Sequence, residues 1–129
     1  GVVGDDGDSF SAFGWDDALA EPICQASMIR CTAVNSHGKD RILCSNPAVQ
    51  KRERMTIKLS HDECRTWPIS KVICEGASSY SDLCIAPDGI ICCLYEKGNE
   101  AGKGISTYSG NISFARFDLE WLTDGTDAL

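Results

Sequence analysis

The cysteines of this chain could form disulfides, and its cysteines and histidines together could bind zinc. The 129 residues include eight cysteines and two histidines. Four disulfides are arithmetically possible in an oxidising compartment. Most of the cysteines lie inside apolar runs, where cysteine acts as a small hydrophobic residue, so we expect mostly free thiols. The eight are Cys24, Cys31, Cys44, Cys64, Cys74, Cys84, Cys92 and Cys93.

The spacing of these residues does not favour a zinc site. The sequence has no CxxC pair, and Cys92 and Cys93 are adjacent. Neither His37 nor His61 has ligand-like spacing to two cysteines. No other motif requires a metal or an organic cofactor, and we expect none.

The charge of the chain argues against nucleic acid as a partner. The net charge is -7, and a phosphate field would repel such a chain. One basic cluster, Lys51 to Arg54, stands out, and by pattern alone it is a solvated charge run. No apolar run approaches the roughly 20 residues that cross a bilayer. The first residues lack the basic and apolar regions of a signal peptide, and from their abrupt start we expect the natural N-terminus to lie outside this sequence.

A polar turn closed by an aromatic residue occurs twice. The clearer copy is Ser60–Trp67, and a weaker copy is Val3–Phe10. With an offset of 57 residues throughout, the two copies align Asp5 with Asp62, Gly7 with Cys64, and Phe10 with Trp67. A turn that recurs with the same internal spacing indicates a repeat architecture.

Strand patterns dominate the rest of the chain. Short helical turns are indicated only at residues 16–20 and 118–122, and the glycine-rich stretch 98–110 is expected to be a loop. Residues 35–40 form a polar turn. Alternating or continuous apolar runs predict strands at residues 23–30, 41–44, 55–59, 69–73, 80–86, 90–95 and 111–117.

The order of strands and turns predicts an all-β fold of repeated units. Residues 23–74 hold three strands, the aspartate turn and a fourth strand, and residues 80–117 hold three strands of a next unit. Four antiparallel strands per repeat are typical of a β-propeller blade. A sandwich also has short, regularly spaced strands, but the repeated turn favours the propeller.

The turn Ser60–Trp67 resembles the Asp box of sialidases (neuraminidases), S-x-D-x-G-x-T-W, with Cys64 in place of the glycine. In such a turn the carboxylate of Asp62 accepts backbone N–H groups, and Trp67 packs into the blade. The structural Asp-box positions of the chain are thus Asp5, Gly7, Asp62 and Trp67. Further segments match the C-terminal part of exo-sialidases in order along the chain, namely residues 22–27, 79–83, 93–96 and 112–122.

This resemblance implies the C-terminal portion of a six-bladed sialidase propeller, about two and a half blades. Residues 1–20 would end one blade, residues 21–76 would form a full blade, residues 77–122 most of the last blade, and residues 123–129 a tail.

The resemblance also implies a site. Tyr80 matches the nucleophile of retaining exo-α-sialidases, and Arg52 matches an arginine that binds the substrate carboxylate. A phenol suits this reaction because sialic acid carries a carboxylate on its anomeric carbon, against which a charged nucleophile would have to approach. A planar guanidinium donates two parallel bonds to such a carboxylate. Arg54 is the alternative, because a shift of two residues keeps the same face of a strand.

Two further residues complete the expected site. Glu96 matches a glutamate that orients an arginine of the family's triad, and Gln25 is expected to line the same site as a substrate-binding residue. The family's other two arginines, its acid/base aspartate and the glutamate that activates the tyrosine have no counterpart in residues 1–20. We therefore expect the isolated chain to be inactive.

The resemblance implies sialylated glycans and the remaining propeller blades as partners, and a secreted, periplasmic or lysosomal location, although the sequence carries no address. A non-catalytic lectin or adhesin propeller is the alternative function. A disulfide-stapled secreted domain is a third reading.

Overall fold

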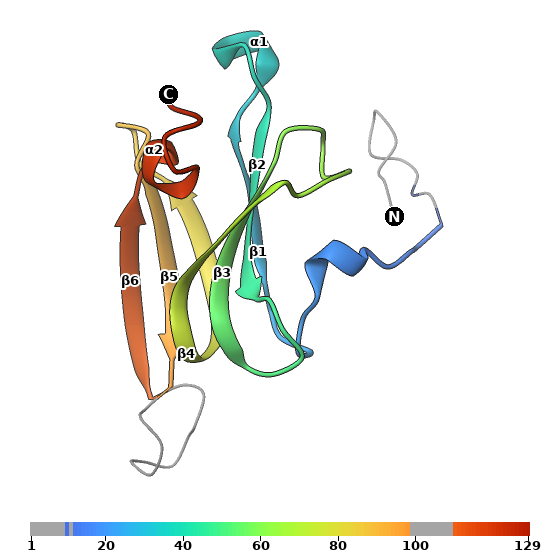
Figure 1. The fold of residues 1–129 in the computed structure, drawn as a ribbon, viewed down its shortest axis with the longest axis vertical. Helices are drawn as coiled ribbons and strands as arrows, with labels where there is room; N and C mark the ends of the chain where they lie inside the picture. The colour runs from blue at the N-terminus through green and yellow to red at the C-terminus, as the bar shows by residue number, and fades with distance from the viewer. Residues whose placement is uncertain (1–9, 11, 99–109) are drawn as a thin grey trace.

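The computed structural model describes Phe10, residues 12–98 and residues 110–129 of the chain. These residues form six strands, two short α-helices and one 3-10 turn (Figure 1). The strands are β1 (Ser27–Thr32), β2 (Arg41–Pro47), β3 (Glu53–Ser60), β4 (Ile69–Ile85), β5 (Ile91–Lys97) and β6 (Asn111–Phe117). The helical elements are η1 (Asp17–Leu19), α1 (Val34–His37) and α2 (Leu119–Leu122). Within the described part, none of the helices has the length and apolar character that crossing a membrane requires.

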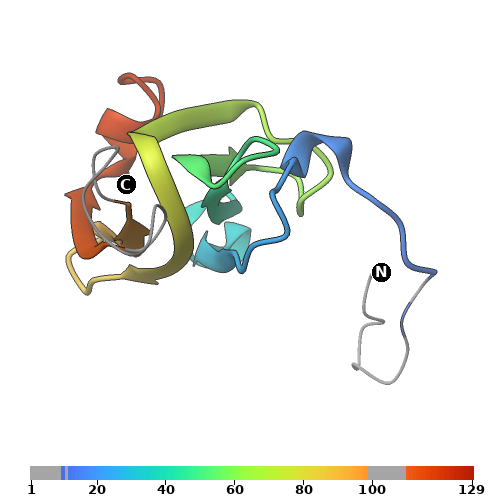
Figure 2. The same cartoon turned by 90° about the horizontal axis from the view of Figure 1, so that it is seen from below.

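The strands neighbour one another in chain order, and every pair is antiparallel. The long strand β4 belongs to two sheets. Its first half pairs with β3 up to Ala77, and its second half pairs with β5 from Ser78 onward. Figure 2 shows β4 bending sharply between these halves. The bend turns the sheet formed by β4, β5 and β6 against the sheet formed by β1, β2, β3 and the start of β4.

The core lies between the two sheets. In β3, Met55, Ile57 and Leu59 alternate along one face and are fully buried. Ile91 and Cys93 of β5 are also fully buried, and Tyr95 is nearly so. Burying one large aliphatic side chain contributes about 1.5–3 kcal/mol, so these two strands supply much of the stability. The rest of the core comes from Leu43, Leu83, Phe117, Leu119 and Leu122.

The predicted all-β class is confirmed, as are the two short helical turns. Asp16 caps η1 by accepting the N–H of Ala18 at 2.9 Å. Asp118 caps α2 by accepting the N–H of Trp121 at 2.7 Å.

Two local predictions were wrong. The strands expected at residues 69–73 and 80–86 are the single strand β4, because the small and polar residues between them pair across the bend, Ala77 with Glu53 and Ser78 with Lys97. The polar turn expected at residues 35–40 contains helix α1, which ends at Gly38 in the left-handed conformation.

The division of the chain into blades stays a prediction. β4 changes its sheet between Ala77 and Ser78, next to the boundary predicted between residues 76 and 77. The loop expected at residues 98–110 and the weaker aspartate turn with Asp5 and Gly7 lie outside the described residues, apart from their end positions.

Candidate functional site

Arg52 and Tyr80 lie together where β3 meets the bend of β4. The backbone N–H of Ser78 donates to the carbonyl of Arg52 at 2.9 Å, which fixes the start of β3 beside this part of β4. The guanidinium carbon of Arg52 lies 5.6 Å from the centroid of the Tyr80 ring, within the range of a cation–π contact. Tyr80 remains 47% exposed, so the face formed by this pair is open to solvent.

The guanidinium of Arg52 is held by two further acceptors. Nη1 donates to the hydroxyl of Ser79 at 3.2 Å, and Nη2 donates to the carbonyl of Ile23 at 3.3 Å. The hydroxyl of Ser79 also lies 3.4 Å from the thiol of Cys24. The segment before β1 therefore packs against the same place as the bend of β4, and both orient Arg52.

A cavity of about 400 Å³ adjoins the ring of Tyr80. Glu96, on β5, lines the cavity, and its carboxylate accepts the backbone N–H of Tyr80 at 3.4 Å. The lining includes the apolar side chains of Leu94 and Ile112 as well as polar ones. The full lining is Gln25, Tyr80, Ser81, Asp82, Leu94, Tyr95, Glu96 and Ile112. The lining carries two carboxylates, Asp82 and Glu96, so the positive charge that an anionic sugar needs has to come from the guanidinium of Arg52 beside the cavity.

Gln25 reaches the same cavity from the segment before β1. Its Nε2 donates to the carbonyl of Ser81 at 3.0 Å, and its Oε1 accepts the N–H of Ser81 at 3.1 Å. Both ends of the amide therefore bind the backbone of the residue that follows Tyr80. Two residues further along, Ser27 donates to Asp82 at 3.0 Å and accepts the N–H of Leu83 at 3.0 Å.

The structure thus brings Tyr80, Gln25 and Glu96 to one cavity, with Arg52 stacked on Tyr80. Arg54, the alternative to Arg52, is directed elsewhere and pairs with Glu75 at 3.3 Å. Sequence reasoning missed Ser79, which is fully buried and binds Arg52. The position of Ser79 directly before Tyr80 could have indicated a role in the site. A position in the sequence alone, however, does not distinguish a buried hydroxyl from a solvated one.

The turn Ser60–Trp67 is built around the carboxylate of Asp62. That carboxylate accepts the N–H of Thr66 at 2.8 Å, the hydroxyl of Thr66 at 2.6 Å and the hydroxyl of Ser60 at 2.9 Å. These bonds, those from Thr66 foremost, lower the pKa of Asp62 to about 2. The indole N–H of Trp67 donates to Asp16 at 3.1 Å. Cys64, at the glycine position, has φ 64°, so a side chain occupies a conformation that favours glycine.

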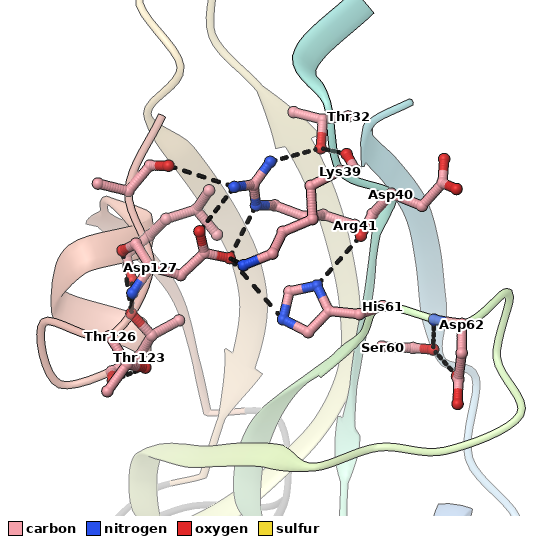
Figure 3. Close-up of polar contacts among 12 residues, drawn as sticks. Thr32, Lys39, Asp40, Arg41, Ser60, His61, Asp62, Thr123, Thr126 and Asp127 are labelled. Atoms are coloured by element: carbon pink, nitrogen blue, oxygen red, sulfur yellow. Dashed lines mark hydrogen bonds and ion pairs between the residues drawn. The ribbon is translucent and has the colours of Figure 1, made fainter. Parts of the chain in front are cut away.

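A second polar cluster fastens the C-terminal tail to β2 (Figure 3). Arg41 donates from Nε to Asp127 Oδ2 at 2.9 Å and from Nη2 to Asp127 Oδ1 at 2.6 Å. Lys39 lies 3.2 Å from the same carboxylate, and His61 lies 3.7 Å from it. The bond from Arg41, with smaller help from Lys39, lowers the pKa of Asp127 to about 2 against the opposing effect of burial. This cluster is an ion-pair anchor between distant parts of the chain.

All eight cysteines lie in the described ranges and are free. Burial raises the pKa of Cys44 to about 11 and that of Cys93 to about 12, so these thiols stay protonated and unreactive at neutral pH. Across the described residues there is no group of three or more histidine, cysteine, aspartate or glutamate side chains placed to hold a metal ion.

Comparison with known proteins relates this chain to sialidases, although no protein-family model matches it. The chain is 38% identical over 125 residues to the sialidase of Micromonospora viridifaciens, covering 94% of this chain and 18% of that protein. It is 28% identical over 127 residues to an exo-alpha-sialidase of Arthroderma benhamiae, covering 90% of this chain and 30% of that protein. The chain therefore spans less than a third of the length of these relatives.

The fold gives the same result. The structure of the Hadza microbial sialidase Hz136 superposes with a TM-score of 0.65 and 34% sequence identity, covering 81% of this chain and 19% of that one. The predicted fold class, antiparallel blades from part of a sialidase propeller, is confirmed by this similarity.

Proposed function

From this relationship to sialidases in sequence and fold, we propose that the chain supplies part of the active site of a retaining exo-α-sialidase. The parent protein, meaning the whole protein that contains this chain, would release terminal sialic acids from glycoconjugates. The observation that carries the proposal is the stacking of Arg52 on Tyr80 beside a cavity lined by a carboxylate.

Tyr80 is the nucleophile in this proposal. Its phenol oxygen forms a bond to the anomeric carbon while the bond from that carbon to the leaving-group oxygen breaks. The phenolic proton passes to a carboxylate, and the leaving oxygen takes a proton from an acid, both supplied by other parts of the parent protein. Water then cleaves the bond between Tyr80 and the sugar, and two displacements at one carbon retain its configuration.

Arg52 binds the carboxylate of the sialic acid. Its hydrogen bonds to Ser79 and Ile23 are long, at 3.2 and 3.3 Å, and a charged acceptor forms shorter and stronger bonds than either. The stacking on Tyr80 places the guanidinium close to the nucleophile. This closeness is required, because the carboxylate of the substrate is bonded directly to the anomeric carbon at which the reaction occurs.

Glu96 is a supporting residue. It lines the cavity and accepts the backbone N–H of Tyr80, and in the proposed enzyme its carboxylate would orient an arginine of the triad. Gln25 lines the same cavity. The other arginines and the acid/base groups of the family would come from the rest of the propeller, which packs against this chain as its partner. The proposal involves no metal or organic cofactor.

The decisive test replaces Tyr80 by phenylalanine in the parent protein. Removal of a nucleophile closes the covalent route, so kcat on a fluorogenic sialoside should fall roughly 10²-fold or more. Wild-type kcat in Tyr80→Phe would overturn the assignment. A parent protein that binds sialosides without cleaving them would instead favour the lectin alternative.

A further inference from the structure

Ser81 is held by an unusual set of side chains directly after Tyr80. Gln25 binds both its N–H and its carbonyl, at 3.1 and 3.0 Å. The hydroxyl of Ser81 lies 2.8 Å from the hydroxyl of Ser45 and donates to the carbonyl of Ser45 at 3.1 Å. Both serines are buried. Ser81 is therefore bound on its backbone by one segment and on its side chain by β2.

This binding occurs where the pairing of β4 with β5 is irregular. The register between β4 and β5 is irregular between Ser78 and Ser81, so Tyr80 lies within the irregular stretch. Its N–H donates to the carboxylate of Glu96 at 3.4 Å, which is long for a hydrogen bond. Tyr80 has no Cα partner in the register between β4 and β5, and the amide of Gln25 binds the backbone of the next residue, Ser81.

We infer that Gln25 is a positioning residue for Tyr80, acting by holding the backbone of Ser81 rather than by binding substrate. The inference rests on the proposed role of Tyr80 as the nucleophile. Both ends of the Gln25 amide are already occupied by one residue, so a substrate would have to displace a matched pair of hydrogen bonds to reach it. Ser81 is buried and Tyr80 is exposed, so the two side chains point to opposite faces of β4, and fixing Ser81 fixes the direction of the Tyr80 side chain.

The chain offers matched variants. Gln25→Ala removes both hydrogen bonds to Ser81. Gln25→Glu keeps the size and the acceptor, but it places a carboxylate oxygen against the carbonyl of Ser81 and loses the donor. Ser27→Ala is the control, because Ser27 makes comparable bonds from the same segment to Asp82 and Leu83, further from Tyr80.

The experiment measures kcat, KM and amide hydrogen exchange for these variants in the parent protein. A misplaced reacting group costs up to about 100-fold, so Gln25→Ala and Gln25→Glu should lower kcat about 10- to 100-fold with KM changed less than about threefold. Exchange in the peptide that contains residues 80–83 should become faster. Ser27→Ala should keep kcat within about twofold of wild type.

Four results would overturn the inference. A rise in KM with unchanged kcat would make Gln25 a substrate ligand. Equal losses of kcat in Gln25→Ala and Ser27→Ala would show a general loss of structure. Unchanged kcat in Gln25→Ala, with Tyr80→Phe inactive, would refute the positioning role alone and leave the proposed function standing. A fully active Tyr80→Phe would instead refute the proposed function, and the inference with it.

Discussion

Arg52 and Tyr80 are far apart in the sequence, yet the guanidinium carbon of Arg52 lies 5.6 Å from the centroid of the Tyr80 ring. A backbone hydrogen bond from Ser78 to Arg52 joins their strands, and Tyr80, which follows the bend of β4, lines the cavity. The pair depends on backbone pairing between two strands that a turn separates. Arg54 instead forms an ion pair with Glu75 of β4, so the fold distinguishes two arginines that lie two residues apart in the sequence.

Replacing Arg52 should chiefly weaken binding of the substrate. Hydrogen bonds to a charged group contribute about 1.5–3 kcal/mol, so Arg52→Ala in the parent protein should raise the KM for a sialoside roughly 10- to 150-fold. Arg54→Ala is the control and should change KM less than about twofold, because its ion pair with Glu75 is exposed. A larger effect from Arg54→Ala than from Arg52→Ala would contradict the assignment.

The anchor of the C-terminal tail should matter for stability. Arg41 and Asp127 are both buried, and removal of one partner leaves a buried charge without compensation. Asp127→Asn should therefore lower the free energy of unfolding by about 3 kcal/mol in chemical denaturation of the parent protein. Asp124→Asn, which alters an exposed ion pair with Lys71, should cost less than about 1 kcal/mol. Equal effects of the two variants would show that the Arg41–Asp127 pair contributes no more to stability than an exposed ion pair does.

The same anchor predicts how stability depends on pH. The pKa of Asp127 is about 2 in the folded chain and about 4 in an unfolded one, so the unfolded state binds the proton more readily. The contribution of the ionised Asp127 carboxylate to the free energy of unfolding is complete above about pH 5 and is lost as the pH falls through the folded pKa. The free energy of unfolding of the wild type should therefore fall more steeply between about pH 5 and pH 2.5 than that of Asp127→Asn. Parallel pH profiles would contradict this account.

The aspartate turn predicts a stabilising substitution. Cys64 has φ 64°, a conformation that costs a residue with a side chain about 1–2 kcal/mol. Glycine removes this strain but loses more entropy on folding, so Cys64→Gly should raise the free energy of unfolding by roughly 0.5 kcal/mol. Cys84→Gly, in the extended strand β4, should lower it by about 0.5–1 kcal/mol. A destabilised Cys64→Gly would mean that the thiol contact with Met28, at 3.8 Å, outweighs the strain.

Local patterns in the sequence predict the strands and turns well, because their causes are local. The alternation of Met55, Ile57 and Leu59 predicts a half-buried strand, and the structure buries all three. The bend of β4 could not be predicted in this way. Residues 75–79 are small or polar and have the composition of a loop, and only pairing with distant strands makes them part of β4.

The site needed more than local pattern. Neither Tyr80 nor Arg52 stands out by composition, and the family resemblance identified them. The anchor at Asp127 was not foreseen, because an aspartate near the end of the sequence has the pattern of a solvated residue. Its partner Arg41 lies far away at the start of β2, and only the folded chain brings the two together.

The most direct measurement traps the covalent intermediate. The probe is a sialoside with fluorine next to the anomeric carbon and a good leaving group. The electron-withdrawing fluorine destabilises the positively charged transition states of both steps, and the good leaving group keeps the first step fast. The covalent intermediate should therefore form faster than it hydrolyses. Mass spectrometry of the digested protein should then find one sialyl adduct on Tyr80, and none in Tyr80→Phe. An adduct on Tyr95 or another residue, or turnover that inverts the anomeric configuration, would contradict the account.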